Sequence, residues 1–152
     1  MKAFIKLVLV AWIAIASAAA GAVERGTPEQ AVAMVHKVIE YMKANGRDKA
    51  IAEVNNLQGQ FRERDLYVTI NDMNAKTLAH GANAKMQGKD LIDLKDADGK
   101  FFMRERLELV KARGKGWQDY KFVNPETKKI EAKSMYFERY GDLIVNCGVY
   151  KE

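Results

Sequence analysis

The C-terminal part of the chain contains three strand-like segments separated by two short turns, and this order limits the fold more than any other feature. The segments cover residues 117–123, 130–139 and 143–150. Residues 124–127 and 140–142 lie between them and have typical turn sequences. Because turns this short cannot hold a helical crossover, we expect the three strands to run antiparallel.

A long amphipathic helix is predicted from residue 27 onward. Thr27 can cap its N-terminus, Pro28 suits the first helical position, and Gln30 stands where a capping box closes. Apolar residues then recur at helical spacing as far as Met42, and Gly46 marks the end.

The middle of the chain predicts a short helix, a hairpin, a loop-rich segment and a second helix. The helix covers residues 48–54, and the hairpin pairs residues 66–70 with 77–80. Residues 81–100 are rich in turn signals, and a further helix runs from Phe101 to Gly114. Helices first and a strand meander last indicate an α+β fold, with an antiparallel sheet covered on one face by the long helix.

The first 22 residues have the composition of a secretory signal peptide. Lys2 and Lys6 precede the apolar run 7–16, and residues 17–22 are small. The alternative is an uncleaved anchor, but the apolar run is shorter than the ~20 residues of a spanning helix. We therefore expect residues 1–22 to be removed and residues 23–152 to form one domain, periplasmic or secreted.

Composition excludes several classes of protein. The chain has 152 residues, of which 48% are hydrophobic, so it is neither disordered nor long enough for two cores. Without Lys2 and Lys6 the 25 basic residues fall to 23 against 20 acidic ones, and this net charge of +3 is too dispersed for a nucleic-acid partner. Cys147 is the single cysteine, and neither histidine is an evident base partner for it. We expect no catalytic site, metal or cofactor.

A series of short motifs follows this outline in order, and each is weak alone but specific in combination. They are Asp65-Leu66-Tyr67-Val68, Leu78-Ala79-His80-Gly81-Ala82-Asn83, Gly88-Lys89-Asp90-Leu91-Ile92-Asp93, Asp98-Gly99-Lys100, Gly116-Trp117-Gln118-Asp119-Tyr120, Asn124-Pro125-Glu126-Thr127-Lys128, Lys133-Ser134-Met135-Tyr136 and Cys147-Gly148-Val149-Tyr150. The series resembles the single Cache family of extracytoplasmic sensor domains over roughly residues 27–151.

The resemblance implies a PAS-like, five-stranded antiparallel sheet packed on the long N-terminal helix. The segment 81–113 would roof the other face and enclose a pocket for a small organic ligand, often a short-chain carboxylate. Members of this family sense and do not catalyse, and they commonly belong to chemoreceptors or histidine kinases. The implied partner is therefore a membrane receptor or a kinase.

Six residues are candidates for the ligand site on this resemblance: Tyr67, His80, Trp117, Tyr120, Lys133 and Tyr136. Lys133 is the best cation on the sheet, although a lysine on an edge strand often only prevents aggregation. Residues three apart on a regular strand face opposite sides, so one of Trp117 and Tyr120 could belong to the core. Lys133 and Tyr136 have the same spacing, and a β-bulge could bring them to one face.

Simpler roles remain open for these and other residues. Tyr67 and His80 could serve packing alone, and Cys147 is expected to be a buried hydrophobe. The basic residues of the second helix predict a solvated face, and they are Arg104, Arg106, Lys111 and Arg113.

The sequence supports an exported small-molecule sensor that acts through a partner. The alternative is a periplasmic interaction or accessory module with a vestigial pocket, and an enzyme is the third choice. The apolar residues of the long helix form either the domain core or the seam of a homodimer, and they are Val32, Val35, Ile39 and Met42.

Overall fold

The computed structural model describes residues 24–151, so the expected signal peptide lies outside the described residues. The elements along the chain are α1 (Pro28–Asn45), α2 (Arg47–Asn55), β1 (Arg62–Glu63), β2 (Leu66–Asp72), β3 (Thr77–His80), the 3-10 helix η1 (Ala84–Met86), α3 (Phe102–Arg113), β4 (Lys115–Val123), β5 (Ile130–Tyr140) and β6 (Leu143–Tyr150). None of the helices within residues 24–151 is long and apolar enough to cross a membrane.

Helix α1 begins and ends where the sequence predicts. The backbone N–H of Gln30 donates to Thr27 Oγ1 (3.3 Å), and the Gln30 side chain accepts from the Thr27 backbone (2.9 Å), which completes the capping box. At the other end Gly46 has a φ of +90°, a conformation that L side chains rarely adopt, and its N–H donates to the carbonyl of Met42.

The sheet is antiparallel throughout, with the order β1-β2-β6-β5-β4 and with β3 pairing with β2. The α+β prediction is confirmed, including the hairpin β2–β3 and the C-terminal meander β4–β5–β6. The sheet has one strand more than the expected five, because the two-residue β1 pairs with the start of β2. So short a strand leaves no hydrophobic pattern in the sequence.

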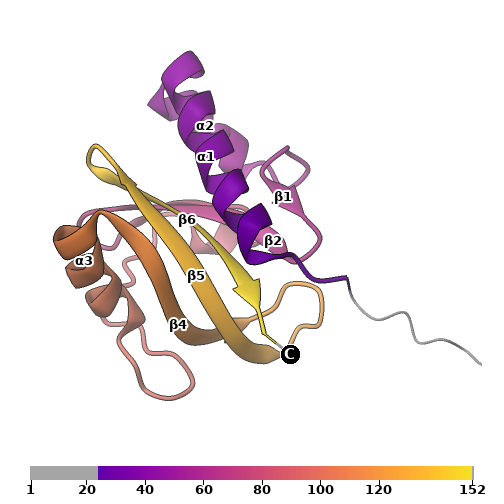
Figure 1. Cartoon of the computed structure of the whole chain (residues 1–152), viewed down its shortest axis with the longest axis vertical. Helices are drawn as coiled ribbons and strands as arrows, with labels where there is room; N and C mark the ends of the chain where they lie inside the picture. The colour runs from indigo at the N-terminus through magenta and orange to yellow at the C-terminus, as the bar shows by residue number, and fades with distance from the viewer. Residues whose placement is uncertain (1–23, 152) are drawn as a thin grey trace, which may run out of the picture.

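Helices α1 and α2 lie on one side of the sheet and α3 on the other (Figure 1), and each face of the sheet carries a separate apolar cluster. One lies between the sheet and α1 with α2, and the other lies beneath α3 and the segment that precedes it. Val35, Ile39 and Met42 belong to the first cluster, and Val32 packs against it. The apolar stripe of α1 therefore belongs to the domain core.

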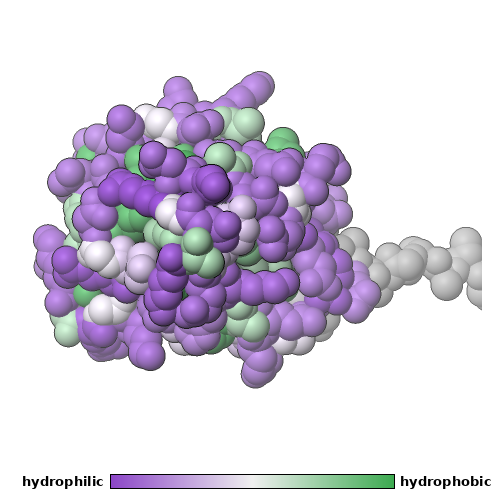
Figure 2. All heavy atoms as spheres, turned by 90° about the horizontal axis from the view of Figure 1, so that it is seen from above, coloured by the Kyte–Doolittle hydropathy of each residue, from purple (hydrophilic) through white to green (hydrophobic). Residues whose placement is uncertain are grey.

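The outer surface is mainly hydrophilic in the view from above, with small separated hydrophobic areas (Figure 2). The large apolar side chains exposed on the described surface are Leu57, Leu94, Trp117, Val123 and Ile130. Scattered residues of this kind are normal for a folded domain.

Candidate functional site

A small chamber lies between α3, the segment before it and the sheet, on the face opposite α1. Its volume is about 20 Å³, room for about one water molecule. Its lining consists of Tyr67, Thr69, Asn71, Thr77, His80, Met86, Leu91, Phe102, Arg106, Tyr120, Phe122 and Met135. We call it the inner chamber. Among the described residues that line it there is no carboxylate, so the single guanidinium gives it a positive charge.

Arg106 on α3 is the cation of the inner chamber. It is only 2% exposed, its Nε donates to Gln118 Oε1 (3.0 Å), and its Nη1 donates to Asn146 Oδ1 (3.4 Å). Its Nη2 is buried without a hydrogen-bond partner within the described part of the chain. The guanidinium also lies over the rings of Phe102 (5.7 Å to the centroid) and Tyr120 (5.2 Å). A buried guanidinium held by neutral amides and aromatic rings, without a carboxylate, is unusual, since buried charges are normally paired.

The expectation that Arg106 lies on a solvated face is wrong, whereas Arg104, Lys111 and Arg113 are exposed as expected. Arg106 falls on the buried stripe of α3 beside Met103 and Val110. That spacing is visible in the sequence, where an arginine at an apolar position is a sign of a buried polar role.

His80 and Tyr67 line the same chamber and stack on each other, with ring centroids 5.1 Å apart. His80 Nδ1 accepts the backbone N–H groups of Ala82 (3.3 Å) and Asn83 (3.1 Å). Burial lowers the pKa of His80 to about 3, and the charge of Lys133 lowers this pKa further. The ring is thus neutral, and because Nδ1 accepts, Nε2 carries the hydrogen and can donate.

A change of register between β2 and β3 brings Thr77 and His80 to one face. Thr69 pairs with His80, and Asn71 pairs with Thr77, so β3 holds one residue more than β2 over this stretch. Both Thr77 and His80 therefore line the inner chamber although they are three residues apart. The bulge lies on β3 and not on β5, where Lys133 and Tyr136 would have needed one to share a face.

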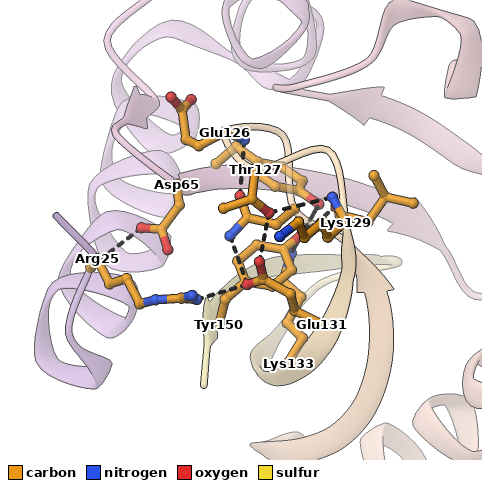
Figure 3. A network of polar contacts seen from close by, with 12 residues as sticks. Arg25, Asp65, Glu126, Thr127, Lys129, Glu131, Lys133 and Tyr150 are labelled. Carbon is orange, nitrogen blue, oxygen red and sulfur yellow. Dashed lines mark hydrogen bonds and ion pairs between the residues drawn. The ribbon is translucent and has the colours of Figure 1, made fainter. Parts of the chain in front are cut away.

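Lys133 lies directly beneath Tyr67 rather than in the chamber lining. It is fully buried on β5, which lies between β6 and β4, so the edge-strand interpretation does not apply. Its Nζ donates to the hydroxyls of Tyr67 (2.9 Å) and Tyr150 (3.3 Å) (Figure 3). Burial lowers the pKa of Lys133 to about 7, and the nearby charge of Arg106 also lowers this pKa.

Gly148 provides the space for the Lys133 side chain. A Cβ atom at Gly148 would lie 2.4 Å from Lys133 Cε, so any larger residue would displace the lysine. Cys147 faces the other side of the sheet and is buried among apolar groups. Burial raises the pKa of its thiol to about 12, in keeping with the expected role as a small hydrophobe.

Trp117 and Tyr136 are not at the chamber, which corrects their assignment as candidates. The β4–β5 register is continuous and pairs Trp117 with Tyr136, and both belong to the α1 face, where their rings are 5.3 Å apart. Tyr120 belongs to the chamber face and stacks on Phe102. The strand alternation noted in the sequence thus decides the matter, because neither strand has a bulge here.

A polar network that the sequence analysis missed forms the floor of the chamber. Asn146 Nδ2 donates to Asn71 Oδ1 (3.0 Å) and to the carbonyl of Thr69 (3.2 Å), and Asn71 Nδ2 donates to Thr77 Oγ1 (3.3 Å). Asn146 is fully buried within the otherwise apolar strand β6. An asparagine inside such a strand can be recognised in the sequence and indicates a buried polar network, since buried polar groups require hydrogen-bond partners.

A larger cavity of about 280 Å³ shares Tyr67, His80 and Phe122 with the inner chamber. We call it the outer cavity. Its remaining lining residues are Ala82, Asn83, Val123, Pro125 and Lys128.

Hydrogen bonds fix the β4–β5 loop that forms one wall of the outer cavity (Figure 3). The Glu131 carboxylate accepts from Thr127 Oγ1 (2.5 Å), Asn124 Nδ2 (3.0 Å) and Arg25 Nη1 (2.8 Å). These hydrogen bonds and the ion pair lower the pKa of Glu131 to about 2, although burial opposes them. The carboxylate therefore stays charged and ties the loop to the segment before α1.

An antiparallel sheet with a long N-terminal helix on one face and a buried cationic chamber on the other defines a PAS-like sensor domain. The sequence profile of the Single Cache domain 2 family matches residues 23–152. The chain therefore belongs to the single Cache family, as its motifs indicate.

Three solved structures with a similar fold are described as chemotaxis or chemosensory proteins. One is described as the periplasmic sensor domain of a chemotaxis protein, with a TM-score of 0.64 and 23% identity over 82% of this chain and 90% of the other. A methyl-accepting chemotaxis protein from Vibrio parahaemolyticus has a TM-score of 0.67 and 22% sequence identity, over 80% of this chain and 86% of the other. A Cache chemosensory domain, described in a structure on carboxylic acid recognition, has a TM-score of 0.65 and 23% sequence identity, over 82% of this chain and 88% of the other.

The methyl-accepting chemotaxis protein McpP of Pseudomonas putida is 30% identical over 90 residues, which are 58% of this chain. The match covers 16% of McpP, so the chain corresponds to a small part of that receptor.

Proposed function

We propose that this chain is an exported sensor module that binds a short-chain carboxylate in the inner chamber and signals through a partner protein. The observation that carries the proposal is Arg106, a buried guanidinium that lines a chamber without a carboxylate and keeps one nitrogen unpartnered. Removing such a charge from water costs stability, and a ligand carboxylate is the counter-ion that would compensate for it.

His80 supplies a further donor. Nε2 of the neutral His80 can donate to a carboxylate oxygen without adding charge. The hydroxyl of Tyr150 donates to the carbonyl of Val123 (2.6 Å), so the 3.1 Å hydrogen bond between the two tyrosine hydroxyls is donated by Tyr67, whose oxygen also accepts from Lys133. Lys133 thus orients Tyr67 from beneath and acts as a positioning residue.

Binding requires a small local adjustment, because the inner chamber has room for about one water molecule. Met86 belongs to the short η1 segment, and its unbranched side chain adapts more readily than the strand residues opposite. A carboxylate group would then replace water beside Arg106, with its carbon chain directed toward the outer cavity.

The partner would be a membrane receptor or a kinase, outside the cytoplasm. Membership of the family, the sensor-domain fold and the relation to McpP support this proposal. The second candidate is an accessory module with a vestigial pocket. The unpaired guanidinium of Arg106 disfavours it, since a chamber without a ligand gains nothing from a buried charge.

Ligand-induced stabilisation tests the proposal. We expect acetate, propionate or butyrate to raise the melting temperature of the purified protein, since at a hundredfold excess over Kd a ligand adds about 2.7 kcal/mol to the free energy of unfolding. Arg106→Met should abolish this rise, whereas the matched change Arg113→Met, at an exposed position of the same helix, should preserve it. Calorimetric titration of each variant measures the affinity directly.

The stability of the unliganded variant separates a binding role from a structural one. Arg106 lacks an anionic partner within residues 24–151, so the gain from removing its buried charge should roughly offset the loss of its hydrogen bonds to Gln118 and Asn146. Arg106→Met should therefore change the stability of the ligand-free protein little. A loss of several kcal/mol in the absence of ligand would show that the arginine serves the fold. Equal ligand responses in wild type and Arg106→Met would contradict the proposed site.

A further inference from the structure

The outer cavity is built differently from the inner chamber. Ala82, Phe122, Val123 and Pro125 give it an apolar wall, whereas its polar groups include Asn83 and Lys128. Because Tyr67, His80 and Phe122 line both spaces, a molecule held at Arg106 would extend along the apolar wall toward these polar groups.

Lys128 is a second cation without a counter-ion. Its Nζ donates to the carbonyl of Pro125, and no ion pair joins it to a carboxylate within residues 24–151. Among the described residues the outer cavity, like the inner chamber, has no Asp or Glu in its lining. Asn83 Oδ1 accepts from the backbone of Lys85 (3.0 Å), which leaves the amide group of Asn83 as a donor.

The position of Lys128 is fixed by the loop that carries it. Its backbone N–H donates to the carbonyl of Asn124 (2.9 Å), and the N–H of Asn124 donates to the carbonyl of Lys129 (2.8 Å). Lys128 has a φ of +62°, which a non-glycine residue keeps only where the surrounding contacts require it. The hydrogen bonds to Glu131 hold the same loop (Figure 3). The backbone that carries the exposed Lys128 is therefore held in place at the rim of the outer cavity.

We infer that the outer cavity is a second anion subsite, in which Lys128 binds the distal carboxylate of a linear dicarboxylate whose other carboxylate is bound at Arg106. This inference rests on the proposed function for the inner carboxylate and adds a specificity residue for the outer one. The apolar wall contacts the methylene groups between the two ends. A linear molecule suits this arrangement, because the two spaces adjoin at the shared residues Tyr67, His80 and Phe122.

Matched pairs of ligands test the inference by calorimetric titration of the purified protein. The pairs are succinate with butyrate, glutarate with pentanoate, and adipate with hexanoate, which differ only in the terminal carboxylate. We expect at least one dicarboxylate to bind about three- to tenfold tighter than its partner, as for a charge-assisted contact at a partly exposed site. This preference should decline as ionic strength rises.

Lys128→Met should remove the preference and leave monocarboxylate affinity unchanged. Lys129→Met is the matched control, because this neighbouring residue is exposed and does not line the cavity, and it should keep the preference. Monocarboxylate binding without any preference for a dicarboxylate would overturn this inference alone, as would a preference that survives Lys128→Met. Absence of binding by both series, together with absence of binding by acetate and propionate, would overturn the proposed function as well.

Discussion

The two faces of the sheet use the same strands for different purposes. On the α1 face the alternate residues of β2 and β6 are apolar and pack against α1 without a buried charge. On the α3 face the intervening residues include Tyr67, Thr69, Asn71 and Asn146, and they surround the buried Arg106. The α1 face thus supplies most of the packing energy, whereas the polar site on the α3 face lowers the stability of the fold.

The α3 face contains two cations, Arg106 and Lys133, and the α1 face does not need such groups for packing. Arg106 and Lys133 are both buried, and each is held by neutral groups rather than by carboxylates within the described residues. An ordinary core would exclude them, because the free-energy cost of desolvating a charge exceeds the energy of its hydrogen bonds to neutral partners. Sites that bind charged ligands commonly retain such unfavourable groups at the expense of stability.

Removal of packing on the α1 face should give the largest effect on stability. Ile39 is 6% exposed in the α1 cluster, and Ile39→Ala should lower the free energy of unfolding by about 2–5 kcal/mol, because a cavity remains. Carboxylate affinity should not change, since the helix lies on the opposite face from the chamber. Urea unfolding measures the loss, with the exposed Lys37→Ala as a control expected to stay within about 0.5 kcal/mol. A loss below about 1 kcal/mol would contradict the assignment of the main packing energy to this face.

The buried amine of the α3 face should make the stability of the protein rise with pH above 7. Since the pKa of Lys133 falls from 10.5 to about 7 on folding, the unfolded chain binds one more proton than the native protein between these values. The free energy of unfolding should therefore rise with pH above 7, by up to about 1.4 kcal/mol per unit. Urea titrations at pH 7, 8 and 9 measure this slope.

Lys133→Met should flatten the slope, whereas the exposed Lys129→Met should keep it. The range ends at pH 9 because the pKa of Cys147 is raised from 9 to about 12, which reverses the trend at higher pH. An equal slope in wild type and Lys133→Met would show that the lysine remains charged in the folded protein.

The smallest effect is expected for Trp117, which is 39% exposed on the α1 side of β4. Trp117→Ala should cost about 1 kcal/mol of stability and leave carboxylate affinity unchanged, because its side chain points away from the chamber. Calorimetric titration compares it with Tyr120→Ala, on the chamber side of the same strand, which should weaken binding. A similar loss of affinity in both variants would contradict the division of the sheet into two faces.

Local patterns in the sequence were sufficient to predict most of the helices, strands and turns of the fold. The capping box at Thr27, the stop at Gly46 and the turns between the last strands all act over a few residues, so their physical effect does not depend on the rest of the chain. Strand β1 was not predicted, because two residues are too few to show the alternating pattern of a strand. The boundaries of α3 and β4 were predicted to within two residues, since Gly114 separates them.

The candidate site was predicted only in part. Tyr67, His80 and Tyr120 line the inner chamber, and Lys133 supports Tyr67, whereas Trp117 and Tyr136 face the other side. Strand alternation separated the members of each pair, but alternation alone does not say which of the two faces is apolar and which is polar. That choice depends on which helix packs on which side.

The sequence by itself determined the order of elements, the antiparallel meander and the membership of the single Cache family, because each depends on local pattern and on motifs in series. The tertiary structure decided which cation enters the chamber. Arg106 on α3 and Asn146 on β6 lie 40 residues apart, and they meet only when the helix folds over the sheet. Their burial, and the unpartnered nitrogen that results, arises from packing between distant segments, which no short window of sequence contains.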